Sequence, residues 1–218
     1  MSHTCCDFRL NHHGAIKVLL VVAAIAVANR PVSGAAEELV PANFGNGFVG
    51  LASLGQIIAE QMNVDRKATV YLVNHSKHEL THPKTYFYSG GSVSLPPKVP
   101  VGEGVVFGVK KSDNASYGVV GVVTYDIQNS NFRLAICFSV PYDQLSYENW
   151  FKIQIINKNT PTDKSLYEDM YYNYHQKTLG DIARAADGYA SWRNGFLMEG
   201  AMGNAGTCEL KLRISELQ

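Results

Sequence analysis

The sequence predicts a mainly β fold, a β-sandwich flanked by two helices. From residue 67 onward, short apolar runs and two-residue alternation are separated by clusters of Gly, Pro, Asn and Ser, which is typical of antiparallel sheets. A helical period precedes these runs, and a second helical patch interrupts them near residue 165. With 46% hydrophobic and 17% charged residues, the chain carries enough apolar side chains to fold around a core.

The first 34 residues have the pattern of a secretory signal peptide. The longest apolar run covers residues 18–28, directly after Lys17. A bilayer span needs about 20 apolar residues, whereas a signal peptide needs roughly 7 to 15. Cleavage after Ala28 or after Gly34 fits the sequence, and the pattern favours neither. We therefore expect a secreted protein whose mature chain begins near residue 35.

Residues 35–63 are expected to form an N-terminal segment containing an amphipathic helix over residues 44–62. Apolar side chains recur there at spacings of three and four, which places them on one helix face. The face comprises Phe44, Phe48, Leu51, Gly55, Ile58 and Met62. The opposite face carries Asn46, Ser53, Gln56 and Glu60, and Val49 and Ile57 do not fit the pattern. Gly45, Gly47, Gly50 and Gly55 predict a weakly held first half, because glycine disfavours a helix interior.

Residues 64–218 are expected to form the sandwich. The predicted strands have the following sequences: ATVYLV, KTYFY, SVSL, GVVFGV, SYGVVGVVTYDI, FRLAICFSV, WFKIQII, YASWRNGFLM and CELKLRI. The second helix should begin near Thr162 or Asp163, with Tyr167, Tyr171 and Tyr174 recurring on one face.

Composition and motifs exclude several classes of function. Nineteen basic residues balance nineteen acidic ones, and no basic stripe predicts nucleic-acid binding. We find no G-x-S-x-G elbow or phosphate-binding glycine loop, so the sequence does not predict an enzyme and implies no cofactor.

His78-Glu79-Leu80-Thr81-His82 matches the H-E-x-x-H pattern of zinc proteases, which requires a helix. Pro83 disfavours a helical His82, and the flanking residues are strand-like. We therefore interpret the motif as a turn and predict no metal site.

Two features depend on the secretory route. Cys137 and Cys208 fall in strand-like runs, and the sequence allows either a disulfide or two buried thiols. Asn74 and Asn114 begin glycosylation sequons, which require exposed loops.

Aromatic residues cluster between Tyr142 and Tyr189, where more than half of the twelve tyrosines and Trp150 lie. Tyrosine and tryptophan suit a water–membrane boundary, and their ring faces bind quaternary ammonium groups. The alternative is that Tyr167 and Tyr171 only pack a helix against a sheet.

Five motifs in order, TYFYSG (85–90), LPPKVP (95–100), FSVPYD (138–143), YENWF (147–151) and LYEDMYYN (166–173), resemble the actinoporins, the pore-forming cytolysins of sea anemones. The resemblance implies a sandwich that binds sphingomyelin and an N-terminal helix that lines an oligomeric, cation-selective pore. The membrane lipid and further copies of the chain are thus the expected partners.

The resemblance also implies which residues act. The family's phosphocholine site maps onto Ser89, Val120, Ser139, Pro141, Tyr147, Tyr167, Tyr171 and Tyr172. Tyr88, Tyr142 and Trp150 are the expected interfacial aromatic residues, and Asn46, Ser53, Gln56 and Glu60 the expected pore-lining residues.

The chain departs from the family pattern at a few positions. Tyr88 stands where an arginine is common, Ser146 where an exposed tryptophan is common, and Asp65 where a basic residue is common. The family's Arg-Gly-Asp is Leu179-Gly180-Asp181 here.

The alternative function is a lectin-like or lipid-binding module that does not permeabilise membranes.

Overall fold

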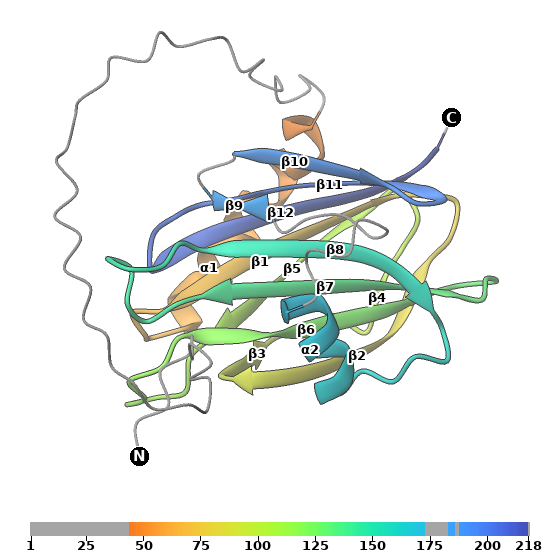
Figure 1. Cartoon of the computed structure of the whole chain (residues 1–218). Helices are drawn as coiled ribbons and strands as arrows, with labels where there is room; N and C mark the ends of the chain where they lie inside the picture. The colour runs from red at the N-terminus through yellow and green to blue at the C-terminus, as the bar shows by residue number, and fades with distance from the viewer. Residues whose placement is uncertain (1–43, 173–182, 186–187, 218) are drawn as a thin grey trace, which may run out of the picture.

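The computed structural model describes residues 44–172, 183–185 and 188–217, which form two six-stranded sheets packed face to face (Figure 1). The predicted β-sandwich with two flanking helices is confirmed. The predicted signal peptide, residues 35–43, Tyr174 and Leu179-Gly180-Asp181 lie outside the described residues.

The first sheet has the order β10-β11-β12-β1-β5-β3. Its strands are β10 (Tyr189–Arg193), β11 (Phe196–Met202), β12 (Thr207–Glu216), β1 (Lys67–His75), β5 (Gly104–Lys110) and β3 (Gly91–Val93). β1 and β12 are parallel, and the other pairs of this sheet are antiparallel.

The second sheet has the order β4-β2-β6-β7-β8-β9 and is antiparallel throughout its described pairs. Its strands are β4 (Lys98–Val99), β2 (Leu80–Ser89), β6 (Val119–Ile127), β7 (Phe132–Val140), β8 (Trp150–Asn157) and β9 (Ala183–Arg184). β4 and β9 have two residues each, and no sequence pattern predicted them. The predicted single run YASWRNGFLM is wrong: it is a hairpin, with Gly195 at φ 70° between β10 and β11.

Each sheet has two buried faces. The main core lies between the sheets and contains Phe107, Tyr125, Phe138 and Phe151 among its largest side chains. On the outer face of the second sheet, α2 (Lys164–Tyr172) buries Leu166, Tyr167 and Met170. The molecule therefore has four layers: the N-terminal helical segment, the first sheet, the second sheet and α2 (Figure 1).

The N-terminal helical segment (residues 44–62) packs on β1 and β5 of the first sheet. It is a 3₁₀ helix, η1 (Gly45–Leu51), followed by α1 (Ala52–Gln61), so the prediction of one α-helix over residues 44–62 is wrong in its first half. The change falls where three of the four glycines cluster, which disfavour an α-helix. None of the helices in the described part of the chain is both long and apolar enough to cross a bilayer.

The predicted helix face is nevertheless the one that the sheet covers. Phe44, Phe48, Gly55 and Met62 are buried, and Leu51 and Ile58 are half-buried. Val49 and Ile57, the two exceptions to the pattern, are 76% and 51% exposed, and Leu54 is also exposed.

A buried ion pair supports the start of this segment. The Arg213 guanidinium donates two hydrogen bonds to the Glu199 carboxylate, at 2.6 and 2.7 Å, and the Tyr189 hydroxyl donates a third at 2.6 Å. Burial alone raises the pKa of Glu199, but the hydrogen bonds from Arg213 and Tyr189 lower it below its usual value. Phe44 lies on this network, with its ring 5.3 Å from the Arg213 guanidinium and 5.2 Å from the Tyr189 ring.

The thiols and one sequon are buried. Cys137 belongs to the cluster under α2 and Cys208 to the main core, so the second sheet separates them and both are free thiols.

Asn74 is 0% exposed, and its amide donates to the carbonyls of His78 and Val99. Asn74 is therefore unsuitable for a glycan in this fold, whereas Asn114 is exposed.

We expect Gly55→Ala to destabilise the protein. A Cβ at residue 55 would lie 1.9 Å from the Tyr71 hydroxyl oxygen, and such overpacking costs about 1–3 kcal/mol. Gly50→Ala is the matched control, because a Cβ there meets no atom within 4 Å and alanine favours a helix by up to about 1 kcal/mol. Urea denaturation measures both free energies of unfolding; equal values for the two variants would contradict the packing described above.

Candidate functional site

The predicted aromatic cluster lies where α2 packs on the second sheet. Asp163 begins this helix, and its carboxylate accepts hydrogen bonds from the backbone N–H groups of Ser165 and Leu166 at 2.9 and 3.2 Å. The predicted helix start is therefore confirmed. Leu166 and Met170 anchor the helix on β6 and β7, which fixes the direction of Tyr167 between them and of Tyr171 and Tyr172 directly after them.

The tyrosines and Trp150 form one connected group of rings. The Tyr171 ring lies 4.9 Å from Trp150, 4.8 Å from Tyr172 and 5.2 Å from Tyr167, measured between ring centroids. Tyr167 in turn stacks on Tyr88 at 5.5 Å with an angle of 15° between the planes. The helix, β2 and β8 thus present aromatic rings that the fold has already ordered.

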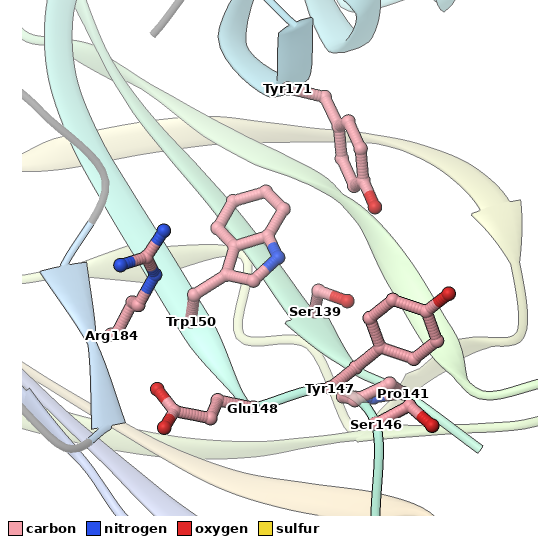
Figure 2. Close-up of a pocket in the computed structure, with 8 residues that line it drawn as sticks. All are labelled: Ser139, Pro141, Ser146, Tyr147, Glu148, Trp150, Tyr171 and Arg184. Atoms are coloured by element: carbon pink, nitrogen blue, oxygen red, sulfur yellow. The ribbon is translucent and has the colours of Figure 1, made fainter. Parts of the chain in front are cut away.

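A pocket of about 400 Å³ opens beside this group (Figure 2). The tip of Tyr171 points from α2 toward it, and Ser139 lies between Tyr147 and Trp150. The lining residues are Ser139, Pro141, Ser146, Tyr147, Glu148, Trp150, Tyr171 and Arg184. Four of the eight residues predicted for the phosphocholine site thus line one pocket, together with the predicted interfacial residue Trp150.

The other four predicted residues lie around the pocket or beneath it. Val120, in β6 beneath α2, is 1% exposed, and Tyr167, on the face of α2 that packs on the sheet, is 2% exposed. The Ser89 hydroxyl donates to the Gly118 carbonyl at 2.8 Å. Tyr172 is 58% exposed, next to Tyr171.

Tyr142 occupies a different environment. The Arg66 guanidinium donates two hydrogen bonds to the Tyr142 carbonyl, and Arg66 and Lys111 both lie 5.1 Å from its ring centroid. Lys111 also pairs with Asp65 at 2.7 Å, and this hydrogen bond lowers the pKa of Asp65. Tyr142 therefore connects the loop between β7 and β8, which lines part of the pocket, to the residues that follow α1.

Three of the four predicted pore-lining residues lie on the solvent side of the N-terminal helical segment. Ser53, Gln56 and Glu60 are exposed, and the Gln56 amide donates to the Glu60 carboxylate at 3.1 Å. The side chain of Asn46 lies outside the described residues.

The sequence did not predict Glu148 or Arg184 as site residues. Glu148 is part of the YENWF motif, but no spacing or charge pattern distinguishes it from a solvated acid. Arg184 reaches the pocket because the two-residue strand β9 pairs with β8.

The H-E-x-x-H match is not on a helix. His78 ends a turn, and His82 lies in β2 at φ 49°, in a bulge before Pro83. Among the described residues, no group of three or more His, Cys, Asp or Glu side chains could hold a metal ion.

Comparisons with known proteins agree on a family. The family model described as "Sea anemone cytotoxic protein" matches residues 41–216. DELTA-actitoxin-Aas1a of Anthopleura asiatica is 30% identical over 92% of this chain and 95% of its own. Deep sea actinoporin Cjtox II of Cribrinopsis japonica is 32% identical over 74% of this chain and 72% of its own.

A solved structure shares the fold at low identity. The lipid binding protein Nakanori aligns with a TM-score of 0.62 and 14% identity, covering 77% of this chain and 79% of its own.

We expect Tyr167→Ala to destabilise the protein by about 3–5 kcal/mol, because it removes a fully buried ring from beneath the pocket. Tyr172→Ala is the matched control on the same helix; it truncates an exposed ring and should cost about 0.5 kcal/mol. The free energy of unfolding in urea measures both effects. A Tyr167→Ala protein as stable as the control would show that the ring stack does not hold α2.

Proposed function

Since the chain belongs to the sea anemone cytotoxic protein family, whose members are pore-forming cytolysins, we propose a function in three steps. The secreted protein binds the phosphocholine headgroup of sphingomyelin in the pocket of Figure 2. The N-terminal segment then leaves the first sheet and inserts as a helix. Several copies together line a cation-selective pore.

The observation that carries the headgroup assignment is the ordered ring group at the pocket. Tyr171, Trp150 and Tyr147 offer aromatic faces, each of which attracts a quaternary ammonium by about 0.5–2 kcal/mol. Ser139 adds a hydroxyl, and a volume of about 400 Å³ is in the range of small-ligand sites. These features together favour a choline-bearing headgroup.

The packing of the N-terminal helical segment supports its release. Phe44 and Phe48 belong to a separate cluster with Tyr71, Val73, Val106 and Tyr189, on the outer face of the first sheet. Because this cluster shares no residue with the main core, the segment can leave without opening the sandwich.

The composition of the segment suits a lipid environment. Val49, Leu54 and Ile57 are exposed apolar side chains in the resting structure, and lipid would remove them from water. In a pore, a continuous helix would satisfy its own backbone hydrogen bonds, as hydrocarbon requires. The exposed Ser53, Gln56 and Glu60 would then face water, and the carboxylate would favour cations.

The first test is dye release from paired vesicle sets, one of phosphatidylcholine alone and one with added sphingomyelin. We expect release to be stronger with sphingomyelin. We also expect Tyr171→Ala to weaken vesicle binding by about tenfold, because it removes ring contacts worth roughly 1.4 kcal/mol. Binding without release by the intact protein would favour the alternative, a lipid-binding module that does not permeabilise membranes.

The second test holds the N-terminal helical segment on the sheet. The Leu51 side chain lies against Gly104, so Leu51→Cys/Gly104→Cys places two thiols side by side. We expect the oxidised protein to bind vesicles without releasing dye, and reduction to restore release. Each single cysteine variant is a control that cannot form the bond. Release by the fully oxidised protein would contradict insertion of this segment.

A further inference from the structure

Arg184 and Glu148 bring opposite charges to the pocket. The other residues lining it are uncharged at neutral pH: two serines, two tyrosines, a tryptophan and a proline. Figure 2 shows both ionised side chains at the same end of the pocket, with the Arg184 guanidinium next to the Trp150 indole.

Strand pairing fixes the position of Arg184. In β9, Arg184 pairs with Trp150 and Ala183 pairs with Phe151. Because neighbouring side chains of a strand point to opposite faces, burial of Ala183 and Phe151 in the main core directs Arg184 and Trp150 outward together. The guanidinium therefore lies beside the indole as a consequence of sheet register.

The support beneath this pair is well anchored. Ala185 N–H donates to the Asn149 carbonyl at 2.9 Å. The Asn149 side chain is 0% exposed and donates to the carbonyls of Gly203 and Ala205 at 2.8 and 2.9 Å. The position of Arg184 is thus set before any ligand arrives.

The basic and hydroxyl groups around the pocket contact other parts of the protein. Arg66 bonds the Tyr142 carbonyl, and Lys111 bonds Asp65. Tyr88, an uncharged ring, stacks on Tyr167, and the Ser89 hydroxyl donates to Gly118. Within the described chain, the basic residue that lines the pocket is Arg184.

We propose that Arg184 binds the phosphate of a zwitterionic lipid headgroup, while Glu148 excludes headgroups that carry an additional negative charge. A guanidinium can donate two parallel hydrogen bonds to phosphate oxygens. Glu148 attracts the ammonium group and repels a further carboxylate or phosphate at short range. The inference rests on the proposed function, since it assigns the determinants of headgroup choice at that same site.

The experiment compares free ligands with the full chain. Binding of phosphocholine and of choline chloride is measured by NMR titration for the wild type, Arg184→Gln and Arg184→Lys. We expect Arg184→Gln to weaken phosphocholine binding by about tenfold or more, as expected for a charged hydrogen bond, without changing choline binding. Arg184→Lys should restore part of the loss, and Arg193→Gln, an exposed arginine of β10, should change neither affinity.

Each outcome is decisive. Unchanged phosphocholine binding by Arg184→Gln would overturn the assignment and leave the proposed function standing. Equal losses for both ligands would mean that Arg184 only holds the pocket together, which also overturns it. Failure of the wild type to bind phosphocholine or sphingomyelin vesicles would instead refute the proposed function.

Vesicle binding tests Glu148 separately. Binding is compared between vesicles of phosphatidylcholine, which are zwitterionic, and vesicles in which phosphatidylserine replaces it. The wild type should prefer the zwitterionic vesicles, and Glu148→Gln should reduce this preference by several-fold. Glu168→Gln on α2, outside the pocket, is the control. An unchanged preference in Glu148→Gln would overturn the role of this carboxylate.

Discussion

The main core lies between the two sheets and contains no side chain from η1, α1 or α2, and the roles open to the helices follow from this separation. The sandwich is a stable platform that each helix covers through its own cluster. On one outer face, α2 orders the aromatic rings of the pocket. On the other, the N-terminal helical segment packs through a cluster that shares no residue with the main core. In the proposed function, headgroup binding and release of this segment would therefore take place on opposite faces of the sandwich.

The same separation sets the cost of rearrangement. If the N-terminal helical segment left the sheet, as proposed, Tyr71, Val73 and Val106 would become exposed to water, and Phe44 and Phe48 would leave their cluster. Exposure of these side chains is unfavourable in solution, and so is loss of the Phe44 contact above the Arg213 guanidinium. In the proposed function, burial of the segment in lipid would offset that cost at the membrane. The same cost would keep the segment on the sheet in solution.

Periodicity predicted the parts of the fold that burial dictates. The face of the N-terminal helix and the start of α2 at Asp163 follow from local rules, since apolar spacing and capping act within one turn. The change from a 3₁₀ helix to an α-helix near residue 52 does not follow from local rules. Several glycines precede it, and contacts with the sheet then decide which helix the backbone forms. The hairpin at Gly195 was missed because apolar residues continue on both sides of the turn.

The pocket was predicted in part for a similar reason. Ser139, Pro141, Tyr147 and Tyr171 lie in motifs long enough to carry a family resemblance. Arg184 belongs to a two-residue strand that pairs with Trp150, more than thirty residues earlier in the chain. No local sequence pattern predicts a pairing over that separation. The burial of Val120 and Tyr167 likewise depends on how α2 sits on the sheet.

Burial of Cys137 and Cys208, the two cysteines outside the predicted signal peptide, has a practical consequence. Both are enclosed by side chains, and burial raises the pKa of Cys208 to about 12 and the pKa of Cys137 further still. Thiolates, which react with maleimides, are therefore scarce at both positions at neutral pH. A single cysteine placed at an exposed residue such as Val49 can then carry an environment-sensitive fluorophore in an otherwise unmodified chain. A mature chain that begins near residue 35, as the sequence predicts, would thus allow site-specific spectroscopy without removal of Cys137 or Cys208.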